Sequence, residues 1–274
     1  MKKITTILIT LILLTGFISC GNDNANKDNL PDFVKNSMTL VWSDEFEQKS
    51  DEPNPEFWDY NVGGSGWGNS EIQTYTMSRE NSYVSNGTLK IVANKNDKGR
   101  WQSARLITSF KKNFTYGYIE FRAKLPTEAG SWPALWMMPQ RDTYGKWPRS
   151  GEIDVMEYAT NTWGKMCYGT CHCFAGSGGN ALAHGGLELK DATAWHTYAV
   201  NWTEDKLTWY IDGVETVSYD NPHSEELGWH EWPYDKPFYI IMNVAMGGTL
   251  GGDVPKKLKK CQMEVDWVRV YQNK

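Results

Sequence analysis

Three acidic residues lie close together in the segment GEIDVMEYAT. The apolar residues between them indicate a β-strand, in which successive side chains point to opposite faces. Glu152 and Asp154 then share a face, whereas Glu157 has the opposite parity. A β-bulge at Val155 or Met156 would bring all three carboxylates onto one face. Without the bulge Glu157 would point to solvent on the other face or into a sandwich core, where an unpaired charge is unfavourable.

Carboxylates grouped in this way suit the hydrolysis of glycosidic bonds. One ionised carboxylate attacks the anomeric carbon, and a second, protonated one donates its proton to the leaving oxygen. A third carboxylate between them can hydrogen-bond to the nucleophile. The chain also carries fourteen Trp and fourteen Tyr, whose flat faces can bind sugars, although most of them are expected to fill the core. The sequence therefore points to a carbohydrate-active strand.

The elements that would position this strand are themselves short strands. Helical periodicity is nearly absent, and Asp212-Gly213 predicts a tight hairpin turn. Many strands without alternating helices indicate a sandwich or barrel. Pro133 is expected at a bulge or an unpaired amide, because proline cannot donate to a ladder. The segments that favour strands are TLKIVAN (88–94), GYIEFRAKL (117–125), HTYAVNWT (196–203), LTWYIDG (207–213), FYIIMNVAM (238–246), which is apolar on both faces and so central, and CQMEVDWVRVY (261–271).

The N-terminus has the features of a bacterial lipoprotein signal. Two lysines precede an apolar run from Ile4 to Ile18 that is short for a membrane span. We expect residues 1–19 to be removed and Cys20 to be lipidated, which would place the protein at the outer membrane or cell surface. An ordinary secretory signal is the alternative, and it too implies export.

The rest of the chain divides into a tether and one domain. Residues 20–37 are polar and rich in Asn and Asp, which is typical of a flexible segment. Residues 38–274 suffice for a single all-β domain, which we expect to be monomeric. The net charge of −5 argues against nucleic acid as a partner.

The cysteines do not follow a metal-binding pattern. Cys167, Cys171 and Cys173 share one face of a predicted strand, whereas His172 lies on the other. Their spacing fits no standard zinc site. Buried thiols, or one disulfide that includes Cys261, are favoured over metal binding.

The acidic strand resembles the active-site strand of glycoside hydrolase family 16, whose bulged pattern is Glu-x-Asp-x-x-Glu. Agreement of many segments in one order makes the resemblance specific. It implies an all-β jelly-roll sandwich, concanavalin A-like, with a substrate cleft on its concave sheet. It also implies retaining hydrolysis of a β-linked polysaccharide without a catalytic cofactor. The matching segments are LVWSDEF (40–46), WGNSEIQTYT (67–76), SARLITSFKKNFTYGYIEFRAKLP (103–126), WPALWMMP (132–139), WHTYAVNWTEDKLTWYIDG (195–213), WPYDKPFYIIMNVAMGG (232–248) and VDWVRVYQ (265–272).

Roles carry over from the resemblance by position. Glu152 is expected to be the nucleophile, Glu157 the general acid/base, and Asp154 the assisting carboxylate. Core packing is an alternative for Trp132, an ion pair for Arg105, and a structural role for His172. The residues expected to contact the sugar chain are Asn69 and Arg105 on its non-reducing side, Trp132, Trp136, His172 and Asn243.

The bulged motif resembles the laminarinase, agarase and carrageenase branches of the family. The segments WGNSEIQTYT, TYGYIEFRAKLP and MNVAMGG favour a β-1,3-glucanase. Leu250 stands where those enzymes commonly carry a Trp, which leaves room for mixed-linkage β-1,3/1,4-glucan. We expect internal cleavage of β-1,3-glucan. The alternatives are an agarose- or porphyran-type galactan as substrate, transglycosylation, and a non-catalytic glycan-binding protein.

The resemblance also implies one structural calcium ion away from the chemistry. The matching ligands are the Glu45 side chain, the Gly87 carbonyl and the Asp266 side chain. Oxygen ligands from distant segments suit calcium. Ion pairing at the surface is the alternative for these carboxylates.

Overall fold

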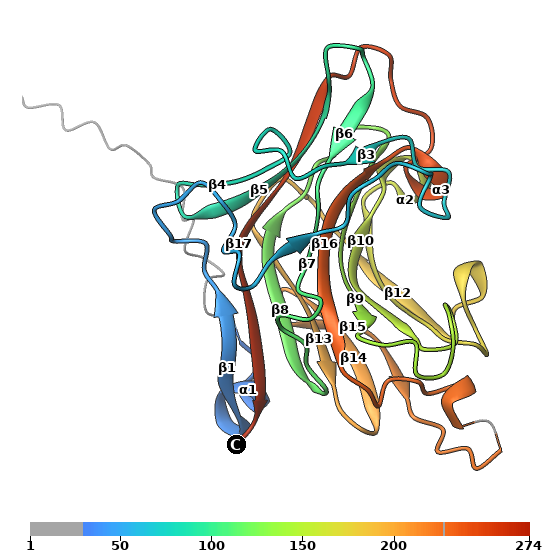
Figure 1. The fold of residues 1–274 in the computed structure, drawn as a ribbon. Coiled ribbons are helices and arrows are strands. Elements are labelled where there is room, and N and C mark those ends of the chain that lie inside the picture. The colour runs from blue at the N-terminus through green and yellow to red at the C-terminus, as the bar shows by residue number, and fades with distance from the viewer. Residues whose placement is uncertain (1–29, 227) are drawn as a thin grey trace, which may run out of the picture.

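Two β-sheets make up most of the molecule. The computed structural model describes residues 30–226 and 228–274, so the predicted signal peptide and Cys20 lie outside the described residues. A 10-stranded sheet and a 7-stranded sheet lie against each other as curved layers (Figure 1). The predicted all-β sandwich is confirmed.

The larger sheet has the order β15-β14-β13-β8-β17-β5-β6-β3, with β1 beside β17 and β4 beside β5. β17, which is central in this order, is the C-terminal strand that the sequence predicts. The strands are β1 (Met38–Asp44), β3 (Thr74–Tyr75), β4 (Ser82–Ser85), β5 (Thr88–Lys95), β6 (Trp101–Ser103), β8 (Gly117–Lys124), β13 (His196–Trp202), β14 (Lys206–Ile211), β15 (Val214–Asp220) and β17 (Lys260–Asn273).

The smaller sheet has the order β12-β11-β10-β9-β16-β7-β2 and carries the acidic segment as β10. β16 is paired on both sides, as its apolar sequence predicts. Its register with β9 runs unbroken through Pro133, and the β10–β9 pairing ends at Ala134. The strands are β2 (Asp59–Tyr60), β7 (Arg105–Ile107), β9 (Ser131–Pro139), β10 (Glu152–Tyr158), β11 (Met166–His172), β12 (Ala183–Glu188) and β16 (Phe238–Met246).

The core lies between the two sheets. Phe121 and Val200 of the larger sheet and Leu135, Ile153 and Met242 of the smaller one are completely buried in one cluster. Burial of side chains of this size stabilises the fold by about 2 kcal/mol each. Since the core takes one face of the smaller sheet, the other face is free to carry polar groups.

The four described cysteines are buried and free. Cys167, Cys171 and Cys173 belong to the core cluster, and Cys261 packs there against Met246. The predicted buried thiols are therefore confirmed. The alternative disulfide with Cys261 is not formed.

The end of the predicted tether differs from expectation. Residues 32–37 form a helix, α1 (Asp32–Ser37), on the outer side of the larger sheet (Figure 1). Val34 is 1% exposed and packs with Tyr118, Ala199 and Tyr271. The polar composition of the segment does not indicate this helix. Its contact with the sheet depends on one buried residue, Val34, and on the neighbouring Phe33.

The remaining helical elements are short turns: α2 (Thr160–Trp163), α3 (Gly248–Gly251), η1 (Gly178–Asn180) and η2 (Gly228–His230). α2 and α3 lie near each other at one end of the smaller sheet (Figure 1). Across the part of the chain that the structure describes, every helix is too short or too polar to cross a membrane.

The two carboxylates of the predicted calcium site, Glu45 and Asp266, are engaged elsewhere. Glu45 accepts two hydrogen bonds from Arg269, at 3.0 and 2.9 Å, and Asp266 lies 2.5 Å from Nη1 of Arg122. This arrangement matches the ion-pairing alternative. The two carboxylates do not fit a calcium shell as they stand, because an arginine already neutralises each one. Calcium binding stays a prediction, which elemental analysis of the purified protein would decide.

Candidate active site

A β-bulge in β10 resolves the parity of the three acids. Asp154 lies opposite Thr170 and Glu157 opposite Tyr168, so β10 has one residue more than β11 over this interval. The β9 side shows the same irregularity. Val155 and Met156 both enter the core, at 2% and 0% exposure. The two apolar side chains thus turn inward together, and Glu152, Asp154 and Glu157 share the opposite face, as predicted.

A tryptophan of the larger sheet hydrogen-bonds to the backbone at the bulge. The indole Nε1 of Trp209 in β14 donates to the backbone carbonyl of Asp154 at 2.7 Å. A Cβ atom on Gly169 would lie 2.2 Å from the Trp209 ring, so only glycine lets the ring reach β10. The carbonyl of Asp154, which the irregular β-ladder leaves inside the core, therefore has a hydrogen-bond partner. This bond stabilises the bulged form of the strand.

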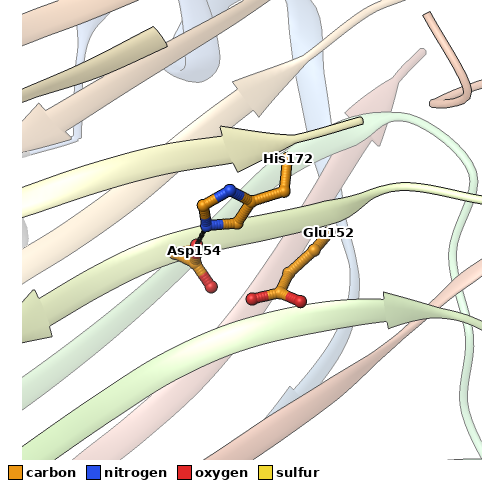
Figure 2. A group of neighbouring side chains, drawn as sticks. All are labelled: Glu152, Asp154 and His172. Atoms are coloured by element: carbon orange, nitrogen blue, oxygen red, sulfur yellow. Dashed lines mark ion pairs between the residues drawn. The ribbon is translucent and has the colours of Figure 1, made fainter. Parts of the chain in front are cut away.

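Each of the three carboxylates has its own partner. Trp147 Nε1 donates to Oε2 of Glu152 at 2.6 Å, and Trp132 Nε1 donates to Oε1 of Glu157 at 3.0 Å. Asp154 lies 3.1 Å from Nε2 of His172 through its Oδ2 atom. Figure 2 shows the carboxylates of Glu152 and Asp154 side by side, with the His172 ring above Asp154. Two indoles thus hydrogen-bond to the two glutamates, and one imidazole lies beside Asp154, whose Oδ2 atom has no hydrogen-bond partner among the described residues.

Burial raises the pKa of all three carboxyl groups. The pKa of Glu152 rises to about 8, first through burial and then through the charge of Asp154. The pKa of Glu157 rises to about 7, through burial and the charge of Glu152. The pKa of Asp154 is also raised, by burial and by Glu157. Neighbouring carboxylates in one buried cluster cannot all be charged, so the cluster shares protons near neutral pH. One group is then available as a base or nucleophile while another is an acid.

A cation lies between two aromatic rings next to the acids. The guanidinium carbon of Arg105 lies 4.8 Å from the ring centre of Trp67 and 4.6 Å from that of Trp136. Its Nε atom is buried and has no hydrogen-bond partner among the described residues. Glu71 contributes an attractive charge. Arg105 is therefore held by stacking rather than by the ion pair considered as an alternative.

Hydrogen bonds connect Trp136 to an acid that the sequence analysis did not identify. Trp136 Nε1 donates to Asn243 Oδ1 at 2.7 Å, and Asn243 Nδ2 donates to the Tyr75 hydroxyl at 3.0 Å. The Tyr75 hydroxyl donates to Glu71 at 3.3 Å, as does Nδ2 of Asn69 at 3.4 Å. This chain of bonds fixes the orientation of the Trp136 indole.

The structure brings the predicted sugar-contacting residues onto one face. Trp132 is not simply a core residue, because its indole holds Glu157. Asn69, Arg105, Trp136 and Asn243 gather over β7, β16 and β9, and His172 lies on the β11 side of the acids. Their contact with sugar stays a prediction. Trp147 was missed, because it lies in a loop without periodicity, and Glu71 was missed although it stands in WGNSEIQTYT.

One group of side chains has metal-ligating types. Within residues 30–226 and 228–274, the one group of three such residues is Glu152, Asp154 and His172, whose ligand atoms lie within 4.8 Å of one another. The same atoms are needed for acid–base chemistry on a glycosidic bond.

Comparison with known proteins gives matches along most of the chain. The profile of the glycosyl hydrolases family 16 matches residues 69–269. A β-glucanase of Rhodothermus marinus is 42% identical over 279 residues, covering 96% of this chain and 94% of the relative. The crystal structure of the laminarinase from Rhodothermus marinus superposes with a TM-score of 0.81 at 41% identity, covering 86% of this chain and 98% of that one. A non-specific endo-β-1,3(4)-glucanase, crystallised with an oligosaccharide at its active site, has a TM-score of 0.80 at 35% identity, over 86% of this chain and 95% of that chain.

Proposed function

Since the chain belongs to glycosyl hydrolase family 16 and is a glycoside hydrolase, we propose that it cuts β-1,3-linked glucan internally, with retention of the anomeric configuration. The observation that carries this proposal is the bulge in β10, which places three carboxyl groups with raised pKa values on one face. Two carboxyl groups in different protonation states are what the reaction requires.

In the first step Glu152 attacks the anomeric carbon and forms an ester with the sugar. Glu157 gives its proton to the glycosidic oxygen, and the sugar on the leaving side departs as an alcohol. Trp147 and Trp132 hold the two carboxyl groups through their indole N–H groups, which limits their rotation before the reaction. Asp154, which lies 3.1 Å from His172, stays beside Glu152.

The loss of the Glu152 charge in the first step prepares Glu157 for its role in the second step. The charge of Glu152 is one cause of the raised pKa of Glu157. When Glu152 becomes an ester this charge is lost, and the pKa of Glu157 falls. Glu157, now ionised, takes a proton from water, the water oxygen attacks the anomeric carbon, and Glu152 leaves as a carboxylate. One residue therefore acts as acid and then as base.

The substrate is proposed from the relatives and from the chain's own residues. The relatives above are a β-glucanase, a laminarinase and a non-specific endo-β-1,3(4)-glucanase. Leu250, in α3, replaces the aromatic residue that the resemblance leads one to expect there. We therefore propose β-1,3-glucan as the preferred substrate, with mixed-linkage β-1,3/1,4-glucan as a second one.

Product analysis on four polysaccharides tests this proposal. We expect rapid release of oligosaccharides of several lengths from laminarin, slower release from lichenan, and none from agarose or xyloglucan. A mixture of lengths at early times indicates internal cleavage. Faster cleavage of agarose than of laminarin would overturn the choice of glucan, and release of monosaccharide alone would overturn internal cleavage.

We also propose that the protein is exported and anchored through a lipid on Cys20. The support is the apolar segment with two preceding lysines and the polar stretch that follows Cys20. In cells fed labelled fatty acid, the parent should carry label and Cys20→Ala should not. Cys261→Ala, which changes a buried thiol, should keep it. Equal labelling of the parent and Cys20→Ala would contradict the anchor.

A further inference from the structure

Three ring side chains cover the smaller sheet on the far side of β10 from Arg105. Tyr168 lies directly opposite Glu157, and His184 lies opposite Thr170 on the next strand. The Tyr168 and His184 rings are stacked, with centroids 4.2 Å apart and planes at 15°. Trp163, at the end of α2, meets Tyr168 at 4.9 Å and His184 at 5.8 Å. We call these three residues the Trp163 cluster; the mechanism above does not use them.

Hydrogen bonds fix the position of α2, the short helix that carries Trp163. Asn161 Nδ2 donates to the carbonyls of Gly251 and Asp253, at 2.6 and 2.8 Å. The Thr162 hydroxyl donates to the carbonyl of Leu250 at 2.5 Å. These bonds attach α2 to α3 and to the loop that follows α3 (Figure 1). α2 therefore holds Trp163 in a fixed position. This lowers the conformational entropy that is lost when a ligand binds.

The local residues also leave the other two rings accessible. A Cβ atom on Gly186 would lie 2.9 Å from the Tyr168 ring and 2.0 Å from a backbone carbonyl, so only glycine fits beside the ring, and Tyr168 itself is half-buried. The Thr170 hydroxyl lies 3.0 Å from Nδ1 of His184 and orients the imidazole. Partial burial, and then the charge of His172, lower the pKa of His184, which favours the neutral ring. His184 remains exposed, and its Nε2 can exchange a hydrogen bond with a sugar hydroxyl.

Resting on the proposed function, we propose that Trp163, Tyr168 and His184 bind the sugar on the leaving side of the cleaved bond. Glu157 gives its proton to the oxygen of this sugar, so the sugar must lie next to Glu157, where Tyr168 stands. The residues expected on the non-reducing side lie in the opposite direction, over β16 and β7. Flat aromatic faces suit the C–H faces of a glucosyl unit.

The same subsite binds an acceptor for sugar transfer. A glucan that occupies it after the first step presents a hydroxyl to the glycosyl ester of Glu152. The hydroxyl oxygen bonds to the anomeric carbon, Glu157 takes the hydroxyl proton, and Glu152 leaves as a carboxylate. The Trp163 cluster therefore sets how often the enzyme transfers a chain instead of hydrolysing it.

The test compares a substrate that places sugar on the leaving side of the site with one that does not. Laminarihexaose, with added labelled laminaribiose as acceptor, gives the ratio of transfer to hydrolysis. β-Laminaribiosyl fluoride measures the first step without a sugar on the leaving side. Trp163→Ala and His184→Ala should each lower the transfer ratio and kcat/KM on the hexaose by about tenfold, the size expected for one aromatic contact. Both should keep the parent rate on the fluoride within about twofold.

A matched control is Trp195→Ala, which removes a partly exposed indole that lies against Arg122 and Lys124 on the larger sheet. It should leave the transfer ratio unchanged. Equal losses on the fluoride and the hexaose would show that the cluster is only structural and would overturn the inference. So would an unchanged transfer ratio in both variants. A parent that cleaves neither compound would instead contradict the proposed function.

Discussion

Glu152→Ala is expected to abolish turnover of β-glucan while the protein still folds and binds the chain. Loss of a nucleophile lowers kcat by at least about four orders of magnitude. The fold should persist, because the side chain faces away from the core and its removal relieves repulsion with Asp154. Initial rates on laminarin and the far-UV circular dichroism spectrum measure the two effects.

Chemical rescue makes this prediction specific. Azide can enter the space left by the Glu152 carboxylate and attack an aryl glucoside with a good leaving group. It should give the α-glycosyl azide, because a single displacement inverts the anomeric carbon. Glu215→Ala, which changes a surface glutamate of β15, is the matched control and should keep full activity. If Glu152→Ala retained more than about a hundredth of the parent rate, another residue would be the nucleophile.

Glu157→Ala should have the second-largest effect, and it should depend on the leaving group. Loss of a general acid lowers the rate on laminarin by about 10²- to 10⁴-fold. The formation of the glycosyl ester from a dinitrophenyl glycoside should fall by less than about tenfold, because that group leaves without a proton. Azide should here give the β-glycosyl azide, formed from the ester in a second displacement. Equal losses on both substrates would exclude the acid role.

The pH profile gives an independent measure of Glu157. A general acid must be protonated, so the parent rate on laminarin should fall as pH rises through about 7, the pKa of Glu157. The acidic limb reports the first deprotonation of the coupled carboxyl groups, because Glu152 taken alone, with a pKa of about 8, would not ionise below the pKa of Glu157. On the dinitrophenyl substrate, whose leaving group needs no proton, this alkaline limb should be absent from kcat/KM in the parent and in Glu157→Ala alike. A parent rate that stays constant from acid to alkaline pH would contradict the mechanism.

Parity and composition were sufficient to predict the central strand of the site. The spacing of Glu152, Asp154 and Glu157 predicts a bulge, because an extra residue brings all three carboxylates onto one face. The strand-rich sequence likewise predicted the sandwich, and the two apolar faces of β16 predicted its place inside a sheet. These features are local, since alternation of side chains follows from the backbone of a strand.

The tertiary structure alone decided which partners the acids have. Trp147 reaches Glu152 from a loop, and Trp209 reaches the bulge from the other sheet, so neither contact follows from a spacing in the chain. Arg269 and Glu45 pair across 224 positions, which changes the interpretation of a predicted calcium ligand. A sequence specifies which faces are apolar and which residue types are present. Contacts between distant segments depend instead on how the two sheets pack, and that packing also sets the burial that raises the pKa values of the carboxyl groups.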